Sequence, residues 1–207
     1  MRWKQLTRHV WGGYVYWPLP VMVWIVEDRD GLTLVDAGIP SMWNSLYQAL
    51  NVRFKNKPLV RVLLTHSHGD HVGMLPNLTR TLQVPIVVHP LEADRISEIA
   101  SNPIISLDLD HTYGGLIPYH TPGHSPGHVV FYHPDDQILL AGDLFTAFSG
   151  KLRRPIAKFT PDMEESLRSG RILERLDPKL TACAHCGVVK HASSQYPKLL
   201  CKGHGSR

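Results

Sequence analysis

The sequence contains little cysteine, with only 3 cysteines among 207 residues. A small secreted domain held together by disulfides needs more of them, usually in an even number, so that class is excluded. The basic start at Met1–Lys4 is followed by polar residues at Gln5 and Thr7 instead of an apolar core, and we expect no signal peptide. These features together predict a reducing compartment and a cytoplasmic location.

Long apolar runs and concentrated charge are also lacking. The longest clean apolar run near the N-terminus, Val21–Val26, is far shorter than the ~20 residues that cross a bilayer. The formal net charge is +4, and Lys and Arg are scattered apart from Lys151–Arg154 and a basic end at Lys198–Arg207. A nucleic-acid-binding protein usually concentrates its basic residues on one face. We therefore expect neither a membrane nor a nucleic acid as a partner.

The sequence does contain short apolar runs typical of strands, and they alternate with helical patterns. Strands are expected at Val21–Glu27, Leu32–Asp36, Val60–Thr65, Ile86–His89, His128–His133, Gln137–Gly142 and Leu180–Ala184. Helices are expected from Ser41, over Leu75–Leu82, from Pro90, and after a capping hydroxyl at Thr160. Turn residues at Asp28–Gly31 and Pro134–Asp136 predict hairpins, which a purely parallel sheet does not contain. The pattern favours an α/β domain over residues 1–207 with two sheets packed face to face, helices outside, and a mobile basic tail from about residue 190.

Histidine is abundant, with 13 residues, and four candidate metal ligands occur within residues 66–71. The segment reads His-Ser-His-Gly-Asp-His and follows a predicted strand directly. In extended chain His66 and His68 point to the same side, whereas the turn at Gly69 directs Asp70 and His71 elsewhere. So many imidazoles beside an apolar strand would repel or stay unsatisfied without a cation. The spacing therefore predicts that one short loop supplies two adjacent metal positions.

Further ligands are expected from loops that follow other strands. His120–His128 is rich in proline and glycine, Asp143 ends the strand after it, and His185 follows the last predicted strand. The last ligand has a rival in His204 near the C-terminus and a weaker one in His191. We select His185 because it follows a strand, as the other ligand loops do, whereas chain ends are commonly mobile. The roles of Cys183 and Cys186 beside it stay open.

These motifs resemble those of the metallo-β-lactamase-fold hydrolases, which include glyoxalase II-type thioesterases and lactonases. The resemblance extends over nearly the whole chain, from Leu34–Gly38 through the H-x-H-x-D-H loop to the late histidine. It implies a four-layer αββα sandwich with two metal ions at one edge of the β layers. It also implies a first metal held by His66, His68 and His124, a second held by Asp70, His71 and His185, and Asp143 bridging both. Asp36 and His128 are expected to support the ligands from behind, or else only to satisfy local backbone.

The resemblance further implies two zinc ions, with manganese or iron as alternatives, that share a hydroxide which attacks a carbonyl. Asp70 and Asp143 are expected to orient that nucleophile. Glyoxalase II-type enzymes carry an additional C-terminal helical region for glutathione, and little chain follows His185 here. We therefore expect a small-molecule ester, lactone or thioester as substrate, with weak β-lactam cleavage as a side activity. The alternatives are a mononuclear iron persulfide dioxygenase, a β-lactam-cleaving hydrolase and, last, a non-catalytic metal-binding module.

Overall fold

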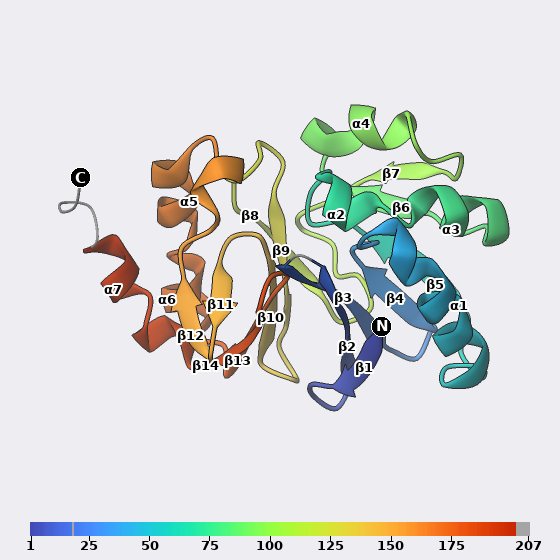
Figure 1. Ribbon diagram of the computed structural model, residues 1–207, viewed down its shortest axis with the longest axis horizontal. Coiled ribbons are helices and arrows are strands. Elements are labelled where there is room, and N and C mark those ends of the chain that lie inside the picture. The colour runs from blue at the N-terminus through green and yellow to red at the C-terminus, as the bar shows by residue number, and fades with distance from the viewer. Residues whose placement is uncertain (18, 202–207) are drawn as a thin grey trace.

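Two mixed β-sheets form the centre of the molecule in the computed structural model, which describes residues 1–17 and 19–201 (Figure 1). The first sheet has the strand order β1-β2-β3-β4-β5-β6-β7 and the second has the order β14-β13-β10-β9-β8. The strands of the first sheet are β1 (Arg2–Gln5), β2 (Val10–Trp17), β3 (Leu19–Glu27), β4 (Leu32–Val35), β5 (Leu59–Leu63), β6 (Ile86–Val88) and β7 (Ile104–Ser106). Those of the second are β8 (Ile117–His120), β9 (Val129–His133), β10 (Ile138–Gly142), β13 (Leu180–Cys183) and β14 (Gly187–Lys190). A separate hairpin pairs β11 (Thr146–Phe148) with β12 (Lys151–Arg153).

Helices cover the outer face of each sheet. The α-helices are α1 (Trp43–Val52), α2 (Gly69–Val72), α3 (Leu75–Thr81), α4 (Ala93–Ser97), α5 (Met163–Ser169), α6 (Ile172–Leu176) and α7 (Pro197–Leu200). Short 3₁₀ helices are η1 (Pro40–Met42), η2 (Pro90–Glu92), η3 (Ala157–Phe159) and η4 (Ala192–Ser194). In Figure 1 α1, α3 and α4 lie on the side of the first sheet, and α5, α6 and α7 on the side of the second. This arrangement confirms the expected four-layer αββα sandwich of two mixed sheets. Within the described residues, no helix is both long and apolar enough to cross a membrane.

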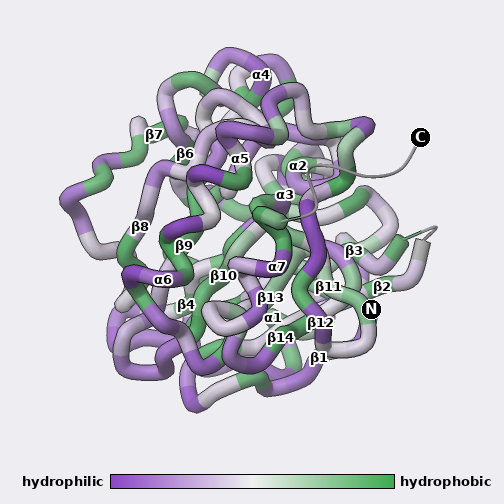
Figure 2. Tube along the Cα trace, turned by 90° about the vertical axis from the view of Figure 1, so that its left-hand side faces the viewer, coloured by the Kyte–Doolittle hydropathy of each residue, from purple (hydrophilic) through white to green (hydrophobic). Residues whose placement is uncertain are grey.

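The apolar side chains of the central strands alternate between an inner and an outer core. On β3, Trp24 and Val26 pack between the two sheets, whereas Val23 and Ile25 pack under the helices of the first sheet. Successive side chains of a strand point to opposite faces, so a strand that is covered on both faces must be apolar throughout. Figure 2 shows the hydrophilic segments concentrated on the outer helices and loops. Burial on both sides thus fixes each strand between the layers.

The N-terminal hairpin of β1 and β2 has no counterpart in the expected strands. The antiparallel pairing places Trp3 opposite Gly13 on β2. A Cβ on Gly13 would lie 2.8 Å from the Trp3 ring, so the glycine provides the space in which that ring lies. Trp3 and Trp11 both meet the edge or face of Phe54 in T-shaped contacts. The aromatic residues of the hairpin therefore join the core beside α1.

Residues 190–201 are folded onto the second sheet. Tyr196 is fully buried and its hydroxyl donates to the Leu167 carbonyl oxygen. The Nε of Arg154 donates to the Leu199 carbonyl oxygen at 2.8 Å. These contacts correct the expectation of a mobile tail from about residue 190 as far as residue 201. Residues 202–207, and with them the rival ligand His204, lie outside the described residues.

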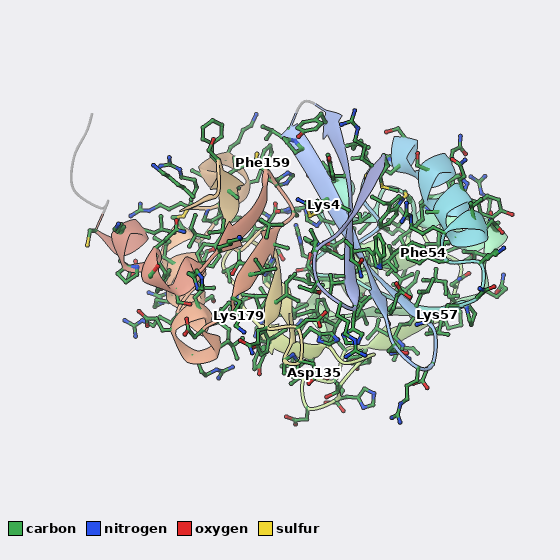
Figure 3. All side chains as sticks on the ribbon, turned by 90° about the horizontal axis from the view of Figure 1, so that it is seen from below. Lys4, Phe54, Lys57, Asp135, Phe159 and Lys179 are labelled. Atoms are coloured by element: carbon green, nitrogen blue, oxygen red, sulfur yellow. The ribbon has the colours of Figure 1, made fainter. Side chains whose placement is uncertain are left out.

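Asp136, in the turn between β9 and β10, links the two sheets at one end of the molecule. Figure 3 labels its neighbour Asp135 at this end and Phe159 at the opposite end. The Asp136 carboxylate accepts hydrogen bonds from the Thr7 hydroxyl and, at 2.9 Å, from the His9 backbone N–H. The His9 ring nitrogen Nδ1 lies 3.0 Å from the same carboxylate. Burial opposes ionisation, but these hydrogen bonds outweigh it and lower the pKa of Asp136. The ionised carboxylate therefore stabilises the fold.

We expect Asp136→Asn to lower the free energy of unfolding by about 1–3 kcal/mol at pH 7. Because the pKa is lower in the folded than in the unfolded chain, this stabilisation is present above the usual carboxyl pKa of about 4 and is lost as the pH falls through the folded value. Urea unfolding at several pH values measures the difference between wild type and variant, which should shrink below about pH 4. Asp135→Asn, at an exposed neighbour, is the matched control. A gap that is the same at pH 7 and pH 3 would contradict the role of the charge.

Candidate metal centre

The candidate ligands lie on loops that leave the two sheets at one shared edge. His66 and His68 follow β5, Asp143 follows β10, and His185 follows β13. The parallel pairing of β10 with β13 sets Gly142 opposite Cys183, so the loops after these strands begin side by side. A hydrogen bond of 2.9 Å from the Val129 N–H to the Thr65 carbonyl oxygen joins the end of β5 to the start of β9 across the sheets. The positions of the histidines are therefore set mainly by how the strands before them pair, and less by the flexibility of the loops.

The first group consists of His66, His68 and His124. The distances are 3.0 Å between His66 Nε2 and His68 Nδ1, 2.9 Å between His68 Nδ1 and His124 Nε2, and 3.2 Å between His124 Nε2 and His66 Nε2. Nitrogens bound tetrahedrally to zinc at 2.0–2.1 Å stand about 3.3 Å apart, which is close to this triangle. A neutral imidazole has one donor and one acceptor nitrogen. When the outer nitrogens hold the protons, three lone pairs converge and fit a shared cation.

The outer nitrogens of two of these rings have partners that fix the proton there. The His124 Nδ1 lies 3.1 Å from the Thr160 hydroxyl, which itself donates to the Ile156 carbonyl oxygen. The hydroxyl proton is thus used, and Thr160 accepts from His124, which leaves Nε2 without a proton. His66 Nδ1 contacts the Thr65 hydroxyl at 3.0 Å in the same manner. Thr160 was expected to cap α5, but the cap is the Asp162 carboxylate, which accepts from the Glu165 N–H at 2.8 Å.

The second group consists of Asp70, His71 and His185. The His185 Nε2 lies 3.3 Å from the Asp70 Oδ2, while its Nδ1 donates to the Pro20 carbonyl oxygen at 3.0 Å. The His71 Nδ1 donates to the Asp36 carboxylate at 2.7 Å. Its Nε2 is buried and has no hydrogen-bond partner. An orphaned buried nitrogen among carboxylates fits a ligand whose metal completes its coordination.

Asp143 lies between the two groups. Its Oδ2 is 3.4 Å from the His124 Nε2 of the first group and 3.3 Å from the His185 Nε2 of the second. Its Oδ1 is 3.4 Å from the His71 Nε2 and has no hydrogen-bond partner, although it is buried. Burial raises the pKa of this carboxyl, but the charges of His71 and His185 outweigh that effect and hold its pKa well below the usual range. A buried carboxylate whose Oδ2 faces both groups and whose Oδ1 faces the second is suited to bridge two cations.

The electrostatics differ between the two groups. Burial first, then repulsion from neighbouring imidazoles, lowers the pKa of His66 well below its usual value and that of His124 to about 4. These rings therefore stay neutral and keep a lone pair for a metal. Burial also opposes a charge on His185, yet hydrogen bonds with Asp143 and Asp70 raise its pKa to about 10. The carboxylates that favour a proton there favour a divalent cation equally, so the donor set fits two cations.

Asp36 and His128 support the ligands from behind. Asp36 is fully buried, and besides His71 its carboxylate accepts from the Thr65 backbone N–H at 2.8 Å. The His128 Nε2 accepts from the Asp143 N–H at 3.1 Å. Gly142 has φ +50°, and a Cβ there would lie 2.9 Å from that nitrogen, so only glycine allows this approach. Both residues hold the backbone of ligand loops, and Asp36 also orients a candidate ligand.

Glu92, at the end of η2, joins the two histidine loops and was missed in the sequence. Its side chain accepts from the Ser67 N–H at 3.1 Å, from the Ser67 hydroxyl, from the Ser125 hydroxyl at 2.7 Å and from the Gly127 N–H at 2.9 Å. Ser67 separates His66 from His68, and Ser125 follows His124. In the sequence, Glu92 lies just after a predicted helix start, and nothing in its neighbours indicates that it belongs to the site. The two serines next to the histidines were the available hint, because buried hydroxyls need acceptors.

The rival ligands and the cysteines do not join these groups within the described residues. His191 is exposed, and His204 lies outside the described part of the chain. Cys183 and Cys186 form no disulfide, and burial raises the pKa of the Cys183 thiol. No group of three or more candidate ligands among the described residues contains a cysteine. The structure thus brings together all seven candidate ligands, with His185 as the late histidine.

A cavity of about 400 Å³ opens onto the ligands. The candidate ligands His68, Asp70, Asp143 and His185 form its polar wall, together with Gly69. The rest of its lining is apolar and consists of Leu19, Val21, Ile39, Ile156 and Phe159. Phe159, labelled in Figure 3, is 52% exposed at the rim. The cavity can therefore hold a small molecule with one polar, reactive end and one apolar end.

A family model described as "Metallo-beta-lactamase superfamily" matches residues 16–185. The "Probable metallo-hydrolase YybB" of Bacillus subtilis is 33% identical over 216 residues, covering 95% of this chain and 96% of that protein. A "Hydroxyacylglutathione hydrolase" of Pseudomonas syringae is 35% identical over 134 residues, covering 61% of this chain and 48% of that protein. The second similarity is thus confined to part of each chain.

Solved structures share the fold. A "Metallo-beta-lactamase from Pontibacter korlensis" superposes with a TM-score of 0.79 at 22% identity, covering 97% of this chain and 99% of that chain. The protein TTHA1623, solved "in a di-iron-bound form", superposes with a TM-score of 0.74 at 25% identity, covering 91% and 97% of the two chains. The second of these similar proteins was therefore solved with two iron ions bound.

Proposed function

This chain belongs to the metallo-beta-lactamase superfamily, and we propose that it is a dinuclear-metal hydrolase of small carboxylic esters, lactones or thioesters. The observation that carries the proposal is the position of Asp143, whose carboxylate lies within 3.4 Å of histidines from both groups. A site for a single metal ion would need no carboxylate between two groups of ligands. We propose zinc as the metal, because neutral imidazoles and carboxylates are ligands that zinc accepts, with iron or manganese as alternatives.

The residues of this chain divide the work of hydrolysis. Two bound divalent cations would lower the pKa of a water molecule and polarise the carbonyl of the substrate. Asp70 lines the cavity with a side chain that is 37% exposed, against 9% for Asp143. We assign Asp70 to orient the attacking water from the solvent side, and Asp143 to hold both groups at a fixed separation. The apolar wall excludes bulk water and favours an uncharged acyl group over an ion.

The test combines metal analysis with a substrate panel. Protein loaded separately with zinc, manganese and iron is assayed on esters, lactones, thioesters, a β-lactam and a persulfide, and bound metal is measured by elemental analysis. We expect about two metal ions per chain and hydrolysis of at least one acyl class. One iron per chain with persulfide oxidation would replace the proposal by an iron dioxygenase. Two tightly held metals with no cleavage of any acyl compound would indicate a metal-binding module.

A further inference from the structure

A second cavity of about 700 Å³ lies beside the one that opens onto the candidate ligands. It is an open hollow bordered by β1, the β2–β3 hairpin, the β11–β12 hairpin and β14, and its apolar lining includes Tyr14, Tyr16, Met22, Phe148 and Val188. Tyr16 and Phe148 are 77% and 65% exposed. Such large side chains are costly to leave in water, so a cluster of them around a hollow indicates an apolar ligand.

The two cavities meet at the start of β3, on either side of its pairing with residues 184–185. Leu19 lines both of them. His185 lines the first, while its neighbours Ala184 and Cys186 line the second. A hydrogen bond of 2.9 Å from the Met22 N–H to the Ala184 carbonyl oxygen fixes this boundary. A chain that begins at the candidate ligands would therefore have to pass around Leu19, at the edge of this pairing, to enter the second cavity.

The charges around the cavities restrict what such a chain can carry. Among residues 1–17 and 19–201, no Lys or Arg lines the first cavity, and Lys4, at the exposed edge of β1, is the one cationic residue that lines the second. A phosphate or carboxylate on the substrate would need several cationic partners to replace its water. An uncharged alkyl chain needs none, and it gains from every methylene that it buries.

We propose that the second cavity binds the alkyl chain of the acyl substrate, so the enzyme prefers long-chain over short-chain uncharged esters, lactones or thioesters. This inference rests on the proposed hydrolase function and adds its substrate class. The carbonyl lies at the candidate ligands, and the chain extends past Leu19 to Phe148 and Val188. Aromatic side chains along this path provide broad apolar contact without fixing one chain length.

The test is a series of p-nitrophenyl esters with acetyl, butanoyl, octanoyl and dodecanoyl groups, assayed with the metal-loaded enzyme. We expect kcat/KM to rise on the order of tenfold to a hundredfold from butanoyl to octanoyl, because each buried methylene contributes up to about a fourfold gain. Val188→Trp fills the second cavity and should bring the dodecanoyl-to-acetyl ratio close to one. Val52→Trp, at a 66% exposed valine on α1, is the matched control and should keep the wild-type ratio.

Binding separates this inference from the hydrolase function. Calorimetric titration of the metal-loaded protein with dodecanoate and with butanoate should show tighter binding of dodecanoate, and Val188→Trp should remove the difference. Hydrolysis of all four esters at equal rates would overturn the chain-binding site and leave the hydrolase intact. Cleavage of none of the esters, lactones and thioesters, with dodecanoate still bound more tightly, would overturn the hydrolase and support the cavity. Equal binding of both acids would overturn the cavity whatever the rates.

Discussion

Replacing Asp143 by alanine is expected to abolish turnover, with a loss on the order of 10³-fold or more, while the chain still folds. In the part of the chain that the structure describes, the carboxylate is the one acidic group within 3.4 Å of His71, His124 and His185 together. Without it, neither group of ligands has its shared oxygen, and the separation between them is no longer fixed. The core is preserved because Asp143 lies at the sheet edge, after the last residue of β10. Far-ultraviolet circular dichroism should therefore be unchanged.

Metal analysis makes this prediction specific. Asp143→Ala should retain no more than one cation per chain, whereas His68→Ala should lose only the cation of the first group. His191→Ala removes an exposed histidine that belongs to neither group, and this control should keep both the metal content and the activity of the wild type. Full turnover in Asp143→Ala, or loss of metal in His191→Ala, would contradict the assigned centre.

The candidate ligands were predictable because each belongs to a short motif at the end of a strand. His66 and His68 share one extended segment, and Asp143 and His185 follow strands whose apolar runs are plain in the sequence. Fold class followed from the same runs, because strands apolar on both faces require two covering layers. The distances between the two groups of candidate ligands could not be predicted from the sequence, since they depend on the register of β10 with β13.

The missed parts depend on contacts between distant segments. β2 carries Gly12 and Gly13, which are poor strand formers, and the reason for Gly13 is the ring of Trp3 on the neighbouring strand. Residues 190–195 contain one apolar side chain, Ala192, and Tyr196 after them becomes a core residue only because the second sheet and α6 leave space for it. Thr160 resembles a helix cap, yet its hydroxyl serves His124. In each case a tertiary partner overrides the local pattern.

Glu92→Gln is expected to weaken binding of the first cation about 10–100-fold, although the hydrogen bonds of Glu92 go to Ser67, Ser125 and Gly127 and not to the candidate ligands. The carboxylate Oε2 accepts from the N–H and hydroxyl of Ser67, and Oε1 accepts from the Ser125 hydroxyl and the Gly127 N–H. An amide replaces one of these acceptors by an NH₂ donor that faces other donors. Because the site is buried, the unmet groups cost about 1–3 kcal/mol, and the two histidine loops move apart.

Metal titration followed by calorimetry measures the effect, and excess metal distinguishes positioning from misfolding. A variant with displaced loops should regain activity as the zinc concentration rises, whereas a misfolded chain should not. Glu98→Gln changes an exposed glutamate just after α4 and should leave both metal affinity and activity as in the wild type. If Glu92→Gln binds two cations with wild-type affinity, the histidine loops hold their positions without this carboxylate. Its four hydrogen bonds would then stabilise the fold alone.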